Sequence, residues 1–218
     1  MAVPTASPVV LDALSASTRR VALAELRERG RATSIDALAS ALASRAAESV
    51  ADAESDPETS WTALYHVHLP VLAEAGAVTF DPETELVAAA TGEPFDEPWV
   101  ERLIADHPEP RYDPTLAALA SERRQFVLYE LLANGPTDDR ALAVAVAGHE
   151  RASEPEAVPH SVADVVWLSL RHTHLPVLAD AGFVESDGRD GTVRAVELPW
   201  RSDPWAAASP LGEWPAVG

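Results

Sequence analysis

The amino-acid sequence of 218 residues contains no cysteine and no lysine. Without cysteine, the chain has no disulfide, no thiolate metal ligand and no cysteine nucleophile. No uninterrupted apolar run reaches the roughly 18 residues that a membrane-spanning helix needs. The opening segment MAVPTASPVV also lacks the basic start and the long apolar stretch of a secretory signal. We therefore expect a soluble, cytoplasmic protein with no membrane partner.

The charge of the chain is predominantly of one sign. All 16 basic residues are arginines, against 35 aspartates and glutamates, which gives a net charge of -19. Carboxylates hold hydrated cations at a protein surface, and concentrated salt screens their mutual repulsion. The composition therefore predicts the acidic proteome of a halophilic archaeon. A GC-rich genome is the alternative, because codon usage would explain the missing lysine, but it leaves the excess of acid unexplained.

Sequence patterns of catalysis are missing as well. The chain has no G-x-S-x-G motif, no glycine-rich phosphate loop and no pair of carboxylates at a recognisable spacing. We therefore expect that the protein is not an enzyme and has neither a catalytic residue nor a cofactor.

One sequence unit occurs twice in the chain. The segment HVHLPVLAEAGAV (66–78) returns as HTHLPVLADAGFV (172–184), and residues between Leu11 and Gly30 match residues between Leu116 and Gly135 at a constant offset. Each unit spans about 80 residues, which is the size of a domain and too long for a solenoid repeat. We predict an N-terminal arm (1–9), a first domain (10–90), a proline-rich linker with one short helix (91–114), a second domain (115–198) and a tail rich in proline and tryptophan (199–218).

The linker and the tail differ in their periodicity. Prolines bracket one short helical candidate in the linker, from Trp99 to Asp106. The tail has neither a helical nor a strand period, so we expect extended chain. Its tryptophans, Trp200, Trp205 and Trp214, are expected to anchor it to a domain surface.

The same order of elements is expected in both units. In the first, Ser17 caps a helix that stops at Gly30, Thr33 or Ser34 caps a second helix, and a third helix ends at Gly76. The alternating segment AVTFDPETELVAA then predicts a β-hairpin around DPET, as FVESDGRDGTVRAVEL does around DGRDG in the second unit. Three helices and a hairpin follow one another in the winged-helix order, in which the hairpin is the wing. We therefore predict a mainly α protein with small β-hairpin wings, built from two tandem winged helix-turn-helix domains.

Apolar residues at helical spacing mark the expected core of each unit. The helices of the first unit are expected near 17–29, 34–45 and 60–75. The expected core residues are Leu23, Leu26, Leu38, Leu64, Leu69, Leu72 and Val78, together with Leu128, Leu131, Leu142, Leu170, Leu175, Leu178 and Val184.

Each third helix carries two histidines and a proline. Residues two apart in a helix point to nearly opposite faces, so His66 and His68 do not grip one ion together. A zinc pair on a helix has i, i+4 spacing, and neither unit has a third ligand placed to complete a site. We therefore expect no metal. The alternative is that Pro70 breaks the helix so far that both histidines lie in extended chain.

The two histidines are expected to differ in burial. His68 falls on the apolar stripe, as expected of a hydrogen-bonded core histidine, whereas His66 lies on the outward face with Pro70; His174 and His172 repeat this pair. A proline inside a helix removes a hydrogen bond and crowds the preceding turn, at a cost of about 3 kcal/mol. We therefore expect a kinked third helix with an exposed carbonyl at His66.

The repeated segments resemble known DNA-binding domains. The segment HLPVLAEAGAV, followed by a hairpin, resembles the winged helix-turn-helix domains of the arsenical-resistance repressor-like class, whose recognition helix closes with an HL..L..AG.V pattern. More closely, ERR.FVLYELL followed by HTHLPVLADAGFV resembles an uncharacterised haloarchaeal winged-helix family with two arginines in its first long helix and an HLP.L...G.V signature. The resemblance covers both units. It implies a transcriptional regulator that binds DNA through its third helix.

Basic residues decide which unit is suited to DNA, because arginines neutralise phosphates and read base edges. The third helix of the first unit contains no Arg, Lys, Asn or Gln, and its one candidate is His66. We therefore predict that double-stranded DNA is a partner mainly of the second domain. The DNA-binding candidates of that domain lie on its third helix and its wing, and they are Arg171, His172, Arg189 and Arg194.

Two alternatives stay open. In one, the arginines of the second unit are ordinary solvated residues of a wing. In the other, the chain is a winged-helix module for protein–protein interaction or dimerisation, and the first unit binds a second copy or another protein instead of DNA. The tryptophan-rich tail and the acidic third helix and wing of the first unit favour this second alternative; the acidic residues are Glu74, Asp81, Glu83 and Glu85.

Overall fold

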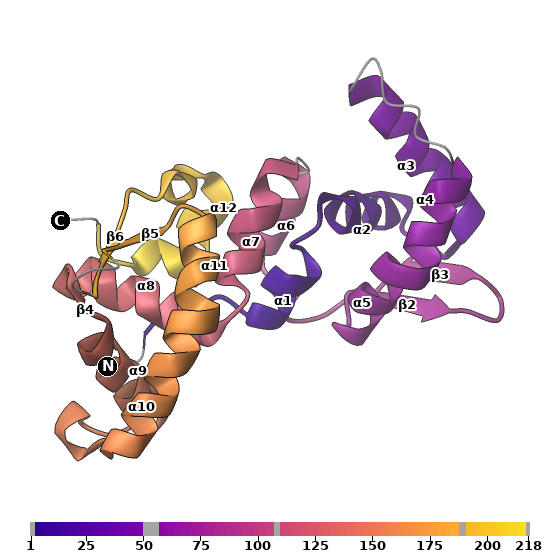
Figure 1. Ribbon diagram of the computed structural model, residues 1–218. Helices are drawn as coiled ribbons and strands as arrows, with labels where there is room; N and C mark the ends of the chain where they lie inside the picture. The colour runs from indigo at the N-terminus through magenta and orange to yellow at the C-terminus, as the bar shows by residue number, and fades with distance from the viewer. Residues whose placement is uncertain (1–2, 50–56, 107–109, 188–190, 217–218) are drawn as a thin grey trace. The chain divides into compact units, whose positions relative to one another are not determined.

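The computed structural model describes residues 3–49, 57–106, 110–187 and 191–216 (Figure 1). They form two compact units, of which the first is Val9–Leu116 and the second is Ala117–Gly218 together with Met1–Pro8. Each unit is mainly helical and has one small three-stranded antiparallel sheet. The prediction of a mainly helical chain with two tandem domains is therefore confirmed. Within the described ranges, no helix is both long enough and apolar enough to cross a membrane.

The two units share the order of their α-helices and strands, from α1 to β3 in the first and from α7 to β6 in the second. The first has α1 (Pro8–Ala13), α2 (Ser17–Arg29), β1 (Thr33–Ser34), α3 (Ile35–Ser49), α4 (Pro57–Ala63), the π-helical turn η1 (Leu64–His68), α5 (Leu69–Glu74), β2 (Val78–Asp81), β3 (Leu86–Ala89), α6 (Pro98–Asp106) and η2 (Pro110–Tyr112). Next come α7 (Asp113–Leu119), α8 (Glu122–Asn134), β4 (Thr137–Asp138), α9 (Asp139–Glu150), η3 (Pro155–Ala157), α10 (His160–Ser169), the π-helical turn η4 (Leu170–His174), α11 (Leu175–Asp180), β5 (Val184–Ser186) and β6 (Thr192–Ala195). The chain ends with η5 (Pro199–Ser202), α12 (Pro204–Ala208) and η6 (Pro210–Glu213).

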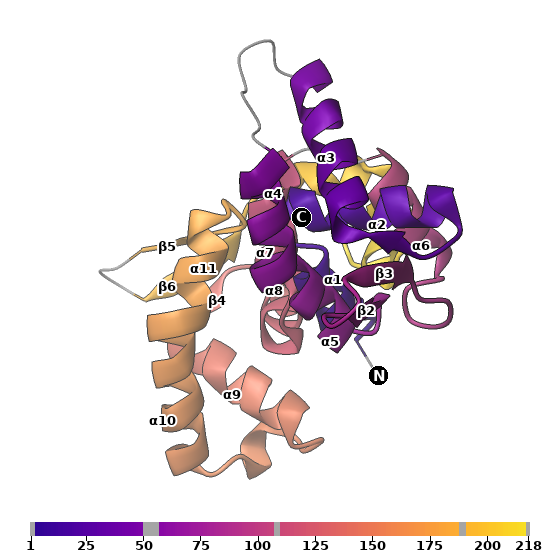
Figure 2. The same ribbon diagram turned by 90° about the vertical axis from the view of Figure 1, so that its right-hand side faces the viewer.

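The predicted hairpins are present, and each gains a third strand. β3 pairs with β2 on one side and with the two-residue strand β1 on the other, while β6 lies in the same way between β5 and β4. Both views show β2 and β3 beside α5 (Figures 1 and 2). Ser34, at the end of β1, accepts a hydrogen bond from the backbone N–H of Ala37 at 3.3 Å, so the predicted cap of the second helix is confirmed.

The predicted cores are confirmed in both units. All fourteen expected core residues are buried, and Leu23, Leu64, Leu72 and Leu178 are fully buried. The segment 91–114 contains α6, whose Trp99 and Leu103 are buried.

The arginine shared by the two first long helices binds the short helix before it. The guanidinium of Arg19 donates to the carbonyls of Ala13 and Asp12 at the end of α1, at 2.5 and 2.9 Å. Arg124 donates in the same way to Ala118 and Ala117 at the end of α7, at 2.5 and 2.8 Å. The last carbonyls of a helix have no partner within that helix, so the arginines supply donors at the ends of α1 and α7.

The predicted cap at Ser17 is wrong. Ser17 is the first residue of α2, and the preceding Ala16 holds the cap position in an extended conformation without a side-chain bond. A different side-chain bond is present before this helix, because the guanidinium of Arg19 donates a hydrogen bond to the hydroxyl of Ser15 at 2.9 Å.

The third helix takes up its proline through a π-helical turn. In the first unit the N–H of Leu69 bonds to the carbonyl of Leu64, five residues back, and in the second Leu175 bonds to Leu170. Such turns take up one extra residue in a helix, and both lie directly before the Leu-Pro pair. Both units therefore accommodate the proline in a wider helical turn, and the alternative in which His66 and His68 lie in extended chain is wrong.

The third helix ends at a glycine, as predicted. Gly76 has φ 81° and Gly182 has φ 73°, in the left-handed region, and the N–H of Ala77 bonds back to Leu72 at 2.8 Å. Side chains with a Cβ adopt this region at a cost of about 1 to 2 kcal/mol. A Cβ added to Gly76 would meet no atom within 4 Å, so only the backbone strain would count.

We therefore expect Gly76→Ala to lower the free energy of unfolding by about 1 kcal/mol. Urea denaturation followed by circular dichroism measures this loss, and Gly182→Ala is the matched variant in the second unit. A gain in stability in either variant would contradict the assignment of a left-handed helix end.

The expectation of an extended tail is wrong, because the tail folds into the short helices η5, α12 and η6. Each begins with a proline, the residue that favours the first helical position because it needs no N–H there. The expected anchoring is confirmed, since Trp200, Trp205 and Trp214 are 5, 0 and 3 % exposed. The indole N–H of Trp214 donates to the carbonyl of Pro4 at 2.7 Å, which ties the tail to the N-terminal arm inside the second unit.

Candidate nucleic-acid interface

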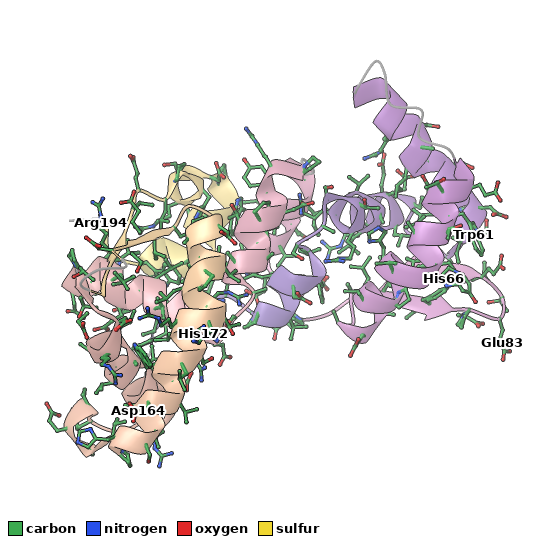
Figure 3. All side chains as sticks on the ribbon, in the orientation of Figure 1. Trp61, His66, Glu83, Asp164, His172 and Arg194 are labelled. Carbon is green, nitrogen blue, oxygen red and sulfur yellow. The ribbon has the colours of Figure 1, made fainter. Side chains whose placement is uncertain are left out.

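The exposed DNA-binding candidates of the second unit lie on its third helix and its hairpin. Arg171 and His172 are exposed on η4, and Arg194 is exposed on β6. Figure 3 labels His172 on the helix and Arg194 on the hairpin. Arg189, the fourth candidate of this unit, lies outside the described residues.

Arg171 belongs to a cluster that also contains Arg140 and Trp167. The guanidinium carbon of Arg140 lies 4.2 Å from the centre of the Trp167 ring, and that of Arg171 lies 5.5 Å from it. A guanidinium over an indole gains about 0.5 to 2 kcal/mol from the ring's quadrupole. The tryptophan therefore orients two cations on one face of the unit.

The sequence did not reveal Arg140 as part of this cluster. Arg140 is the second residue of α9, and only the packing of α9 against α10 brings it to Trp167. The sequence signal near Arg140 is Asp138, which marks the start of a helix. The carboxylate of Asp138 accepts hydrogen bonds from the backbone N–H groups of Arg140 and Ala141 at 2.9 and 3.3 Å.

Carboxylates accompany both arginines of the cluster. Arg140 pairs with Asp164 at 3.1 Å, and Arg171 approaches the mostly buried Asp139 at 3.5 Å. A cavity of about 560 Å³ opens beside the cluster, and its lining includes Asp138, Asp139, Trp167, Arg171, Asp187 and Gly191. Among the described side chains, the site therefore holds two guanidinium groups and four carboxylates, those of Asp138, Asp139, Asp164 and Asp187.

Arg194 on the hairpin is also paired. Its guanidinium contacts the carboxylate of Glu185 on β5, and both side chains are about 60 % exposed. Exposed ion pairs contribute about 0 to 1 kcal/mol, because water and salt compete with them. A phosphate that binds Arg194 would therefore displace Glu185 at little cost in free energy.

The first unit has different residues at the equivalent positions. Trp61 corresponds to Trp167, but Tyr65 stands where the second unit has Arg171, and the acidic Asp36 stands where it has Arg140. His66, the candidate of this unit, is exposed, and its ring meets that of Tyr65 edge to face at 4.9 Å. Figure 3 labels His66 and Trp61 on the third helix.

The exposure predicted for His66 and His172 is confirmed, whereas His68 and His174 are less deeply buried than the core position predicted for them. His66 and His172 are exposed, while His68 and His174 are partly buried. The expected hydrogen bond is not found at the Nδ1 atoms of His68 and His174, which are buried and lack a partner within the described ranges. Desolvation is the main cause that lowers the pKa of both rings, and nearby arginines add to it, Arg19 for His68 and Arg123 for His174.

These lowered pKa values predict a loss of stability in acid. Because the folded protein resists protonation of His68 and His174, the unfolded chain binds more protons once the pH falls below the ordinary histidine value of 6.5. The free energy of unfolding should therefore fall as the pH drops from 6.5 toward the lower folded pKa values. Urea titrations across this range measure the slope. His68→Gln and His174→Gln should each flatten it; an unchanged slope in both variants would contradict the assignment.

Among the side chains that the structure describes, no three or more His, Asp or Glu residues gather closely enough to hold a metal ion. His66 points outward while His68 is half-buried, as expected for residues two apart on a helix.

Comparison with known proteins gives a family but no activity. The family model described as Domain of unknown function (DUF7344) matches residues 11–88 and again residues 116–194. No curated protein and no solved structure matches the chain. The two matched segments follow the repeat that the sequence predicts and together cover most of the chain. The protein therefore belongs to the DUF7344 family and carries two copies of its domain.

Proposed function

We propose that the chain is a DNA-binding transcriptional regulator of a halophilic archaeon, which acts in the cytoplasm and catalyses no reaction. Each DUF7344 domain is then a winged helix-turn-helix, with α10, η4 and α11 as the recognition helix of the second domain and β5–β6 as its wing. The order of three helices and a hairpin, with a short strand that completes the sheet, supports this proposal. Double-stranded DNA is contacted mainly by the second domain.

The cluster of Arg140, Trp167 and Arg171 carries the proposal. In a winged helix the exposed face of the third helix enters the major groove, where arginine binds guanine with two hydrogen bonds. Stacking on Trp167 restricts the guanidinium groups before DNA arrives, which reduces the entropy lost on binding. Arg194 on the wing, together with Arg189, would contact the flanking phosphates, and His172 would lie beside Arg171 in the groove.

The acidic neighbours of the cluster are compatible with this role in concentrated salt. At molar ionic strength the Debye length is about 3 Å, so carboxylates farther away scarcely repel a phosphate. Asp139 and Asp164 lie closer and must exchange their arginine partners for DNA. The affinity for DNA should therefore depend mainly on direct contacts between the arginines of the cluster and the duplex.

DNA binding by the full chain tests this assignment. In fluorescence anisotropy titrations with labelled genomic fragments in molar potassium chloride, Arg194→Ala should weaken binding equally on every sequence, because phosphates carry no sequence information. Arg171→Ala should also relax the base preference by about 1 to 3 kcal/mol. Arg31→Ala, an exposed arginine of the first unit, is the control. Equal affinities for all four proteins would refute the role of the cluster.

The second candidate function is a winged-helix module for protein–protein interaction or dimerisation. The ion pairs of Arg140, Arg171 and Arg194 favour it, because each arginine already has a carboxylate partner. The first unit favours it more strongly, since its equivalent surface is aromatic and acidic. If the chain binds no DNA at any salt concentration at which it stays folded, this candidate replaces the first.

A further inference from the structure

An aromatic cluster lies on the first unit where the second unit has its arginines. The rings of Trp61 and Tyr65 stack with centroids 5.0 Å apart and planes at 12°, and Phe80 meets Tyr65 at 5.7 Å and 87°. All three side chains are partly exposed. Because Phe80 comes from β2 and the other two come from the third helix, the cluster joins the helix to the hairpin. We call these three residues the aromatic triad.

Carboxylates are close to the aromatic triad in the sequence, and three of them, Asp81, Glu83 and Glu85, lie on the hairpin that carries Phe80. Residues 57–89 contain five aspartates and glutamates and no arginine. Asp81, directly after Phe80, has its pKa lowered by hydrogen bonds from the Thr84 hydroxyl and from the backbone N–H of Glu83, so it is ionised. Glu83 and Glu85 are exposed on the same hairpin, and Figure 3 labels Glu83 at its tip.

The second unit shows which group binds at the position equivalent to the aromatic triad. There Arg140, the second residue of α9, lies over Trp167 and pairs with Asp164. In the first unit the corresponding tryptophan is Trp61, and an exposed carboxylate, Glu58, corresponds to Asp164. The residue at the arginine position is Asp36, which is exposed and acidic. The indole and the carboxylate are thus both kept, while the chain's own cation is replaced by a further acid.

We propose that the aromatic triad and its carboxylates form a docking surface for an arginine-bearing segment of a partner protein, whose guanidinium lies over Trp61 as that of Arg140 lies over Trp167. Charge at contact distance decides the occupant, because concentrated salt screens only the more distant charges. Two copies of this surface would bring like charges together, and a nucleic acid would meet carboxylates, whereas an arginine gains both the ring face and the carboxylates. This inference stands apart from DNA binding by the second domain, because it concerns only residues of the first.

Peptide binding by the full chain tests the proposal. The probe is a fluorescein-labelled peptide that alternates arginine and glycine, and the same peptide with lysine is its comparison. In molar potassium chloride, where simple charge attraction is screened, the arginine peptide should bind at least about fivefold more tightly than the lysine peptide, since guanidinium stacks on aromatic rings better than ammonium.

Asp36→Arg is the decisive variant. It restores within the chain the arginine that the second unit has, so it should fill the position over Trp61 and weaken binding of the arginine peptide about tenfold or more. Glu101→Arg makes the same charge change at an exposed position of α6 and should alter the affinity by no more than about twofold. Tyr65→Ala, which removes one ring of the aromatic triad, should also weaken binding.

Several results would overturn the proposal. They are the absence of binding, equal affinity for the arginine and lysine peptides, and equal effects of Asp36→Arg and Glu101→Arg. Self-association of the chain that Asp36→Arg abolishes, measured by sedimentation, would make a second copy the occupant instead. Loss of DNA binding in Tyr65→Ala would assign the surface to nucleic acid. Circular dichroism melts of each variant establish that a lost affinity does not come from unfolding.

Discussion

Replacing Arg20 by alanine should lower the free energy of unfolding by about 3 to 5 kcal/mol. The Arg20 side chain is fully buried, pairs with Asp113 at 2.8 Å and donates to the carbonyl of Leu14 at 2.6 Å. Truncation would leave an acceptor and a carboxylate without their cation and would open a cavity, and each of these effects destabilises the folded state. Denaturant titration monitored by circular dichroism measures the loss.

The second repeat supplies the control for this prediction. Gln125 occupies the position equivalent to Arg20, and its side chain donates to the carbonyl of Leu119 at 2.8 Å. Arg20→Gln should therefore keep the bond to Leu14 and lose only the charge opposite Asp113, which is partly solvated. It should destabilise clearly less than Arg20→Ala. An equal loss in both variants would show that the hydrogen bond to Leu14 contributes nothing.

Replacing Leu72 by alanine should lower the free energy of unfolding by about 2 to 5 kcal/mol. Leu72 is fully buried on the third helix, and its carbonyl also accepts the bond that closes the turn at Gly76. The loss combines the lost burial of the side chain with the cavity that remains. Urea denaturation measures it, with Leu178→Ala as the equivalent change in the second unit.

Val67→Ala is the control for Leu72→Ala on the same helix. Val67 is 52 % exposed, so its truncation removes little buried surface and should change the stability by less than about 0.5 kcal/mol. A loss of less than about half a kcal/mol in Leu72→Ala would mean that the apolar stripe of the third helix does not form the core.

Local patterns predicted the repeated elements well, because each depends on residues close in sequence. Gly76 ends the third helix through its own backbone, and the segment around Asp81 forms a hairpin through its own turn. The fully buried Leu64 and Leu72 follow from helical spacing alone. The repeat reinforced each of these predictions, since the same pattern occurred twice.

Contacts between distant residues account for what the sequence did not predict. The role of Arg19 depends on a short helix, α1, that carries too few residues to show a period. The sequence of the tail predicts extended chain, because its tryptophans follow neither a helical nor a strand period. The tail folds because these tryptophans pack in the second unit, where the rings of Trp200 and Trp205 stack with centroids 5.8 Å apart. Likewise, Arg140 and Trp167 lie on different helices, and neither residue alone predicts the stack.

The absence of cysteine allows the proposed asymmetry between the two domains to be measured directly. His66 and His172 are exposed at equivalent positions on the two third helices. His66→Cys and His172→Cys therefore each introduce a single thiol, to which a photoactivated cross-linker is attached in the full chain. Irradiation with labelled genomic DNA then reports which third helix lies against the duplex.

Cross-linking from position 172 and not from position 66 is the result expected if the second domain contacts DNA. Equal cross-linking from both positions would contradict the asymmetry. The absence of cross-links from both positions, with the cross-linker shown to be active and the chain folded, would contradict DNA contact through either third helix.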